Sequence, residues 1–245
     1  MDVHFIFHSG FAVVTDRANL IFDCWKDPAG VVPSILSNNR LTYFFASHRH
    51  PDHFSPDIFQ YANLNSEVIY ILSSDIKHSL CRKGQQMVIP ARSVFLRRGE
   101  TYCDKLLDEV CATPSTDVGI SFCIRIEDAS IFHAGDLNYW HWRDESTPGE
   151  IKKAYGDFTA ALRTIEEAGY ARFNLAMFPV DSRIGTDYPE GARIFLRTFK
   201  VDNFFPMHFT ENPQSAIRFN LYRNPDYGRC FGLIHPGDMQ KIEIK

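Results

Sequence analysis

The chain has 245 residues, 44% of them hydrophobic and 23% charged, which is the usual balance of a globular protein of one large or two small domains. Its 26 Lys and Arg residues against 30 Asp and Glu give a net charge of −4, which disfavours a broad nucleic-acid-binding face. No segment approaches the roughly 18 consecutive apolar residues of a transmembrane helix. The start, MDVHFIFHSG, lacks the basic region of a signal peptide. We therefore expect a cytoplasmic protein with no membrane partner and no long nucleic acid as ligand.

Short strands broken by turns are predicted for the first half of the chain. LTYFFA (41–46) is a continuous apolar run, typical of a strand buried on both faces. Ser55-Pro56 predicts the start of a short helix through residue 62, because serine caps a helix and proline suits its first position. Another helix is expected from Asp75. The predicted strands cover residues 4–7, 11–15, 19–23, 41–46, 67–72, 93–97, 109–113, 120–127 and 130–134.

Helices and strands alternate in the second half. Residues 148–168 predict a long amphipathic helix, with apolar residues at helical spacing. Two strand-rich stretches with helices between and after them suggest two packed sheets with helices outside. We predict an α/β fold with a β-sandwich core in a single domain, residues 1–245. The other predicted elements are helices 191–199 and 212–222 and strands 173–180, 203–209, 230–234 and 241–245.

The motif that points to chemistry is His48-Arg49-His50-Pro51-Asp52-His53, or HxHxDH, directly after the buried strand 41–46. Imidazole and carboxylate are the ligand types that zinc, iron and manganese use. His48 and His50 can reach one ion, and Asp52 and His53 can turn toward a second. Two ions ~3.5–4 Å apart form a known hydrolytic arrangement. The alternative, a solvated polar loop, does not explain the place of the motif after a buried strand.

The chain resembles the metallo-β-lactamase superfamily, and more narrowly its ascorbate-6-phosphate-lactonase-like and uncharacterised metal-dependent hydrolase members. The resemblance covers nearly the whole chain. It rests on HxHxDH (48–53), FIFHSGFAVV…LIFDCW (5–25), HAGD (133–136) and PMHF (206–209). It implies a four-layer αββα sandwich that holds two divalent metal ions at one edge between its sheets.

The resemblance also implies further ligands. Asp136 matches a carboxylate that bridges both ions, and a carboxylate has two oxygens with which to do so. His208 matches the last histidine, a ligand of the second ion. Asp52 would bind a metal and also orient the nucleophile or carry a proton. The alternatives are an Asx-turn residue for Asp136 and a core histidine for His208.

This chain departs from the family in one ligand of the first ion. The family usually places a histidine in the loop that here reads Pro-Ser-Thr-Asp-Val-Gly (114–119). Asp117 is the expected substitute, and the alternative is a turn aspartate. The site otherwise suits zinc. A carboxylate is a harder ligand than a histidine, so its addition favours manganese or iron.

Several other Asp and His residues are not expected to bind metal. Asp23 is expected beneath the metal loop, orienting ligand histidines. We expect His8 to be structural, outside the ligand set. His78 and His235 are expected at the surface or in the core, and His133 should point into the sandwich.

Two loops are candidates for substrate binding. The loop after Asp136 must lie near the metals, so Tyr139, Trp140 and Arg143 are expected to contact substrate. His141 or a metal-bound water would protonate the leaving group. Asp181 and Arg183, after the predicted strand 173–180, would also face substrate. The alternatives are aromatic packing of the first loop and an internal Asp–Arg pair in the second.

The sequence therefore predicts a metal-dependent hydrolase that acts on a small lactone, ester, amide or phosphodiester. Two other classes stay open: a non-catalytic metal- or ligand-binding member of the fold and an iron-dependent oxidoreductase. The expected partner is a small-molecule substrate. A homodimer is expected only because two-fold assemblies are common.

Overall fold

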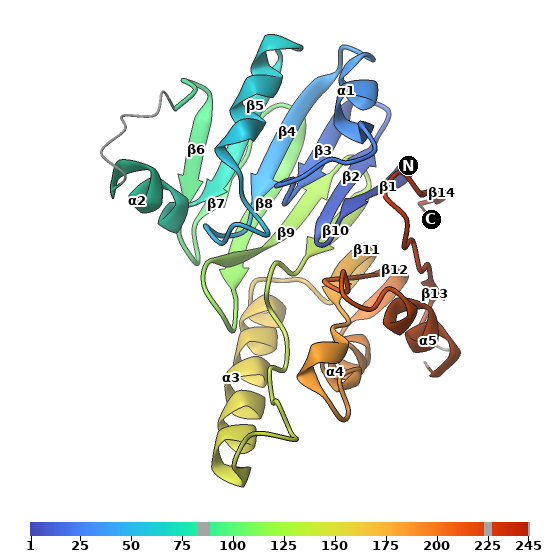
Figure 1. Ribbon diagram of the computed structural model, residues 1–245. Helices are drawn as coiled ribbons and strands as arrows, with labels where there is room; N and C mark the ends of the chain where they lie inside the picture. The colour runs from blue at the N-terminus through green and yellow to red at the C-terminus, as the bar shows by residue number, and fades with distance from the viewer. Residues whose placement is uncertain (83–88, 223–226, 245) are drawn as a thin grey trace.

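The computed structural model describes residues 1–82, 89–222 and 227–244, and in these ranges the strands form two seven-stranded mixed sheets (Figure 1). In the first sheet, β1 to β3 form an antiparallel meander and β3 to β6 run parallel. Its strands, in spatial order, are β14 (Met239–Lys241), β1 (Asp2–Phe7), β2 (Gly10–Val14), β3 (Ala18–Phe22), β4 (Leu41–Ala46), β5 (Val68–Ser73) and β6 (Ser93–Leu96).

The second sheet repeats this pattern. Strands β7 to β10 are antiparallel, and β10 to β13 are parallel. Its strands, in spatial order, are β13 (Arg229–Cys230), β12 (Lys200–Met207), β11 (Arg172–Pro179), β10 (Ala129–His133), β9 (Ile120–Ile126), β8 (Leu107–Pro114) and β7 (Thr101–Tyr102). By these pairings β1, β4, β8, β10, β11 and β12 each end at the edge where the candidate site lies.

Helices cover the outer face of each sheet (Figure 1). The first sheet carries α1 (Val31–Leu36), the 3-10 helix η1 (Pro56–Asn63) and α2 (Ser74–Arg82). The second carries α3 (Pro148–Glu167), α4 (Glu190–Thr198) and α5 (Gln214–Tyr222), with the short 3-10 helix η2 (Ser182–Ile184) after β11. The predicted αββα sandwich is confirmed. In the described ranges, no helix combines the length and apolar character needed to cross a bilayer.

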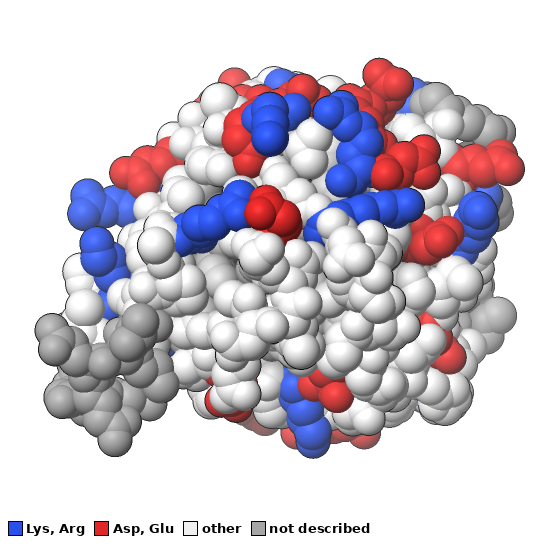
Figure 2. All heavy atoms as spheres, turned by 90° about the horizontal axis from the view of Figure 1, so that it is seen from above, with Lys and Arg blue, Asp and Glu red and all other residues white. Residues whose placement is uncertain are grey.

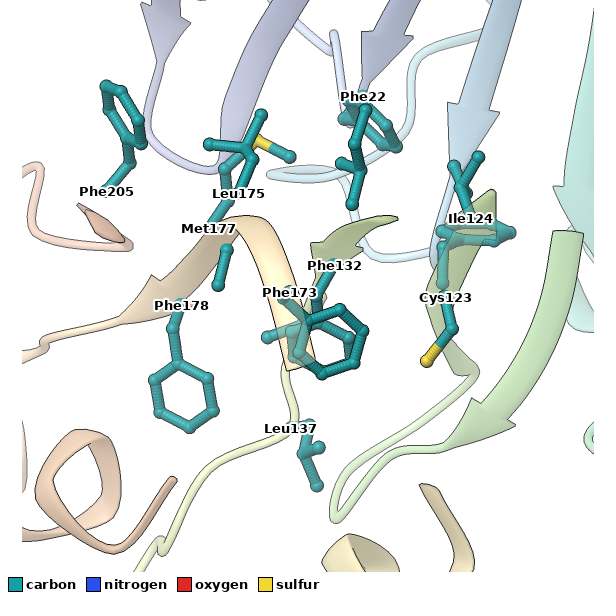
Figure 3. Packing of buried hydrophobic residues seen from close by; sticks show 14 of the residues in the cluster. Phe22, Cys123, Ile124, Phe132, Leu137, Phe173, Leu175, Met177, Phe178 and Phe205 are labelled. Atoms are coloured by element: carbon teal, nitrogen blue, oxygen red, sulfur yellow. The ribbon is translucent and has the colours of Figure 1, made fainter. Parts of the chain in front are cut away.

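Aromatic side chains fill the space between the sheets. Phe45 of the first sheet meets Phe122 of the second at 5.2 Å between ring centroids. Phe22 stacks on His133 at 5.0 Å, so His133 points into the sandwich as expected. Figure 3 shows another part of the buried core, with Phe22 of the first sheet above Leu175 and Met177 of the second. Burial on both faces explains the continuous apolar runs.

Some local predictions are wrong. The last strands pair over 229–230 and 239–241, not over 230–234 and 241–245, and residue 245 lies outside the described residues. Helix α1 was not predicted, because its six residues are too few to show a helical period. It forms because the Asp27 carboxylate accepts hydrogen bonds from the first N–H groups of the helix, at Val31 and Val32.

A pH-dependent cluster of hydrogen bonds is centred on Asp104, in the turn between β7 and β8. The Asp104 carboxylate accepts from the hydroxyls of Tyr43 and Tyr102 and from the N–H groups of Leu106 and Leu107. Burial opposes its ionisation, but these four donors prevail and lower the pKa of Asp104 below 3.8. The ionised carboxylate therefore stabilises the fold above about pH 4, and this contribution is lost as the pH falls through the lowered pKa.

Replacing Asp104 with asparagine is expected to lower the free energy of unfolding by about 1–3 kcal/mol at pH 7. The gap between wild type and variant should shrink as the pH falls below about 4, and urea denaturation over a pH series measures it. The exposed Asp108→Asn serves as the control. A gap that stays constant into acid would contradict the assignment.

Candidate metal centre

Seven His and Asp side chains converge where strands of both sheets end. They fall into two groups whose ligand atoms lie within 4.8 Å of one another. The first group is His48, His50 and Asp136, and the second is His8, Asp52, His53 and His208. Sheet 1 supplies the residues after β1 and β4, and sheet 2 supplies those after β10 and β12.

In the first group, ring nitrogens face one another. His48 Nε2 lies 2.9 Å from His50 Nδ1 and 3.3 Å from Asp136 Oδ2. Two imidazole lone pairs at this distance repel unless a proton or a cation lies between them. The Ser47 hydroxyl, 3.0 Å from His48 Nδ1, holds the far side of the ring. The arrangement fits an ion bound by His48 Nε2 and His50 Nδ1.

The second group adjoins the other oxygen of the same carboxylate. Asp136 Oδ1 lies 3.0 Å from His53 Nε2 and 3.3 Å from His208 Nε2. His8 Nε2 lies 3.6 Å from Asp52 Oδ2. Asp136 therefore presents one oxygen to each group, the geometry of a bridging ligand. His8, which we expected outside the ligand set, belongs to this cluster.

Unpaired polar atoms show that the residues present fit metal ions. Among the described side chains, His8 Nε2, His53 Nε2 and Asp136 Oδ1 are buried and have no hydrogen-bond partner. A buried polar atom without a partner costs about 1–3 kcal/mol. All three atoms are of ligand type and belong to the two ligand groups, so bound cations would satisfy them.

Charge in the cluster is balanced within it. Burial disfavours the ionised form of Asp136, but the neighbouring His53 and His208 hold the pKa of Asp136 well below its usual range. Burial would lower the pKa of His53, yet Asp136 and Asp23 raise it to about 10. Burial, with His208 and His53 nearby, lowers the pKa of His8 to about 2. Without metal, the raised pKa of His53 places a positive charge beside Asp136, whereas His8 stays neutral.

Asp23 holds the metal loop from beneath, as the sequence predicts. Its carboxylate is fully buried and accepts from the Ser47 N–H, the Ser47 hydroxyl and His53 Nδ1, each at 2.7 Å. Burial opposes its ionisation, but His133 and His53 lower the pKa of Asp23. The contact to Nδ1 leaves His53 Nε2 for a metal, which fixes the ring tautomer.

Asp181 orients the ring of His208 in the way that Asp23 orients the ring of His53. The Asp181 carboxylate lies 2.9 Å from His208 Nδ1 and accepts two hydrogen bonds from Arg183. Burial would raise the pKa of Asp181, but His208 and Arg183 lower it to about 2. The Asp–Arg pair given as an alternative is present. The Asp181 carboxylate therefore orients His208, and because Asp181 also lines the pocket, its contact with substrate stays a prediction.

A glycine without room for a side chain joins the metal loop to the second sheet. Gly119 has φ +83°, and a Cβ there would lie 2.2 Å from the Ser47 carbonyl oxygen and 2.4 Å from His48 Cβ. The Ile120 N–H donates to the same Ser47 oxygen at 3.0 Å. Only glycine permits this approach, so Gly119 sets where His48 lies relative to Asp136.

No protein-family model matches the chain. The solved structure of a metallo-hydrolase from the archaeon Ignicoccus hospitalis aligns with a TM-score of 0.68 and 18% identity over 100% of this chain and 99% of that one. The metallo-beta-lactamase fold protein YhfI from Bacillus subtilis aligns at 0.53 and 12% identity over 85% of each chain. The chain has the metallo-β-lactamase fold.

Two other similarities are more partial. CmlA, a diiron beta-hydroxylase from Streptomyces venezuelae, aligns with a TM-score of 0.53 and 14% identity over 84% of this chain and 44% of that one. A chromosome condensation protein of Caenorhabditis elegans, dpy-27, is 24% identical over 165 residues. That match covers 62% of this chain, which spans only 11% of the length of the curated relative.

A pocket of about 420 Å³ opens beside the candidate metal ligands. The rings of Trp140 and Trp142 stack at 6.1 Å along one side, and Trp140 packs its edge on His208. Arg183 also lines the pocket. Trp140 and Arg183, both predicted to contact substrate, therefore lie in the pocket lining together with Trp142, and the contact itself stays a prediction. The full lining is His50, Asp52, Thr116, Asp117, Asp136, Trp140, Trp142, Asp181, Arg183 and His208.

Three residues predicted to contact substrate or donate a proton, all in the loop after Asp136, are absent from the pocket lining. His141 is buried, with its ring nitrogens 3.0 Å from the carbonyl oxygens of Tyr139 and Thr186, so the prediction of a proton-donating His141 is wrong. Tyr139 is also buried and stacks on His141 instead of contacting substrate. Arg143 pairs with Asp187 at 3.2 Å. These residues attach the loop after Asp136 to the loop after β11, while His78 and His235 are exposed.

Asp117 lies at the mouth of the first group without entering it. Its side chain is 48% exposed, and Oδ2 is 3.8 Å from His50 Nδ1. Its backbone N–H donates to Ser115 Oγ, so the turn role is also present. Asp117 is not part of the group formed by His48, His50 and Asp136, so its role as a ligand stays a prediction.

Replacing Asp117 with alanine is expected to weaken one of two bound ions by at least about tenfold and to leave the other unchanged. Elemental analysis after dialysis against graded chelator measures this. The exposed Asp108→Ala is the matched control. Equal retention of both ions in Asp117→Ala would leave Asp117 as a turn residue.

Proposed function

We propose that the protein is a metal-dependent hydrolase that uses a dinuclear site to activate water against a small lactone, ester, amide or phosphodiester. The observation that carries this proposal is Asp136, whose two oxygens each face one of the two ligand groups. Bound there, two divalent ions supply an activated water near pH 7 and polarise the scissile carbonyl or phosphoryl oxygen. Zinc fits the histidine-rich ligand set, and the carboxylates also suit manganese or iron.

The protein groups have separate tasks in this proposal. Asp136 and the histidines place the ions at one edge of the pocket, and Asp23 and Asp181 fix the ring orientations of His53 and His208. Asp52 lines the pocket and is partly exposed, so its free oxygen can orient the water or accept its proton. With His141 excluded, the leaving group takes its proton from this carboxyl or from solvent in the pocket.

The pocket supports a small substrate. A volume of about 420 Å³ lies within the range of small-molecule sites, roughly 300–1,000 Å³. The tryptophans offer an apolar wall for a flat or aliphatic group, and the Arg183 guanidinium offers a partner for an anion. A phosphorylated lactone of the kind that the sequence resemblance suggests would use both features. In Figure 2, the basic side chains on the face shown lie among acidic ones, so this face presents no extended basic patch for a nucleic acid.

The tryptophan wall yields a prediction about affinity. Trp142 is 37% exposed and has no metal ligand beside it in the sequence, so Trp142→Ala removes contact area without touching the ligands. We expect KM to rise about 5- to 30-fold, for a loss of roughly 1–2 kcal/mol, with kcat little changed. Trp25→Ala is a control outside the pocket lining. A fall in kcat at constant KM would place Trp142 in the chemical step instead.

Metal content and turnover together test the proposed function. Protein purified without chelator should hold two ions per chain, and reconstituted protein should hydrolyse members of a panel of lactones, carboxylic esters and phosphodiesters. Loss of turnover on chelation and its return on adding the same metal are expected. Two ions with no turnover of any panel member would favour the non-catalytic alternative.

A specific observation keeps the iron oxidoreductase as the second candidate. The structural neighbour CmlA is a diiron enzyme by description, and this chain adds carboxylates at the pocket. Iron as the resident metal, with oxygen uptake that depends on a reductant, would favour that function over hydrolysis.

A further inference from the structure

We propose that His8 is a ligand of the second metal ion, and that it makes the second site the more tightly binding member of the pair. The proposal rests on the dinuclear centre proposed above and assigns a residue that the HxHxDH motif does not contain. It also distinguishes the two ions by their number of protein donors, which is larger for the second ion.

The orientation of the His8 ring supports ligation. His8 follows β1 and has a left-handed backbone, φ +60°. Its Nδ1 lies 2.6 Å from the Thr210 hydroxyl oxygen, so Nδ1–H can donate there and Nε2 keeps its lone pair. That Nε2 is buried, has no hydrogen-bond partner, and lies 3.6 Å from Asp52 Oδ2. The ring centroid is 4.1 Å from that of His208 and 5.6 Å from that of His53.

A merely structural His8 does not account for these features. The unpaired buried nitrogen costs about 1–3 kcal/mol, and a left-handed non-glycine residue adds a cost of similar order. Phenylalanine or leucine would fill the same space without the first cost. The backbone is held by the His208 N–H, which donates to the His8 carbonyl at 3.1 Å. This hydrogen bond joins the backbones of two histidines that both have left-handed φ angles, +60° for His8 and +63° for His208.

Counting donors shows why the second site would be the tighter one. Its donors would be His8, Asp52, His53 and His208, together with Asp136 Oδ1. The first site has His48, His50 and Asp136 Oδ2, joined at most by Asp117. Residues of both groups line the pocket, His50 from the first and Asp52 and His208 from the second. With fewer donors, the first ion would be the one that keeps an open coordination position for water or substrate.

The test compares two replacements of His8 that differ in reach. His8→Asn keeps the left-handed backbone and a polar group near the Nδ1 position, but no atom at Nε2. His8→Gln extends an amide oxygen toward the Nε2 position. His78→Gln, at an exposed site, is the control. Each protein is stripped of metal, checked by circular dichroism, and titrated with Co²⁺ and Zn²⁺ against a competing chelator.

We expect wild type and His78→Gln to bind two ions, the first at least about 100-fold more tightly than the second. His8→Asn should weaken the tight ion by about 10- to 100-fold or more and change the visible spectrum of the one-cobalt form. His8→Gln should recover part of the affinity. Thr210→Val keeps the His8 ring but removes the hydroxyl that binds its Nδ1, so it should weaken the tight ion by less than His8→Asn does. If His8→Asn does not fold, the metal affinity of Thr210→Val tests the proposal instead.

The outcomes separate this inference from the proposed function. Two ions bound by His8→Asn with wild-type affinities and an unchanged cobalt spectrum would overturn the role of His8 while the dinuclear centre stands. Wild type that binds no ion would overturn the dinuclear centre itself, and the ligand role of His8 with it.

Discussion

Replacing Asp136 with alanine is expected to abolish dinuclear metal binding and to lower kcat/KM for an identified substrate by at least about a thousandfold. The carboxylate adjoins both ligand groups, with Oδ1 3.0 Å from His53 Nε2 and Oδ2 3.3 Å from His48 Nε2. Without it, neither ion would have its shared oxygen, and the cationic form of the buried His53 would lose a counterion. A loss of metal activation worth several kcal/mol corresponds to three or more orders of magnitude in rate.

Elemental analysis and steady-state kinetics on the same preparations measure this effect. Asp128→Ala, at an exposed turn after β9, is the matched control. Asp136→Asn should retain some metal but not the bridge, because an amide has only one oxygen. Full stoichiometry with a normal rate in Asp136→Ala would refute both the bridging role and the dinuclear mechanism.

Asp23→Ala is expected to lower the free energy of unfolding of the metal-free protein by about 3–5 kcal/mol, because it leaves a network of buried donors without an acceptor. The donors are the N–H and hydroxyl of Ser47 and His53 Nδ1, each 2.7 Å from the carboxylate. Asp23→Asn should cost less, since one oxygen still accepts. Urea denaturation at pH 7 measures both, with Asp16→Ala as an exposed control.

The same network makes a prediction about pH. The pKa of Asp23 is lowered in the fold, mainly by His133 and His53 acting against burial. Its contribution to stability is therefore complete above the pKa of the unfolded chain and is lost as the pH falls through the folded value. The difference between wild type and Asp23→Ala should narrow in acid. A difference below about 1 kcal/mol at pH 7 would show that the loop is held without this carboxylate.

The layered fold was predictable because its signals are local or periodic. Continuous apolar runs indicate strands that are covered on both faces. Helix α3 is indicated by apolar residues at helical spacing, and the capping box of Thr147 and Glu150 lies at its start. The elements that were missed or misplaced are short. Helix α1 depends on a carboxylate four residues upstream of its start, and β13 and β14 have only two and three residues. Such elements exist because of tertiary contacts.

The candidate site was predictable where ligands are adjacent in the sequence. HxHxDH places four ligand-type side chains in six residues, and Asp136 and His208 follow buried strands. His8 was missed because it stands alone, with no neighbour at ligand spacing. The one sequence signal, a histidine before Ser-Gly at a strand end, is weak without knowing that β1 and β12 end together.

Side-chain direction explains the errors in the substrate loop. Proximity in sequence to Asp136 places residues 139–143 near the site, but it does not say which way each ring turns. Trp140 turns to the pocket, whereas Tyr139 and His141 turn inward. The substrate, the metal, the cytoplasmic location and the homodimer stay predictions.

The distribution of the ligands over both sheets has a consequence for folding kinetics. Neither sheet alone carries a complete site, since Asp136 and His208 come from the second and His8 and the HxHxDH loop from the first. A metal ion can therefore bind with full affinity only after the two sheets have docked. Its contribution would be largely absent from the folding transition state, so metal should slow unfolding far more than it speeds folding. The metal centre would therefore form late in folding and would raise the kinetic stability of the protein by slowing its unfolding.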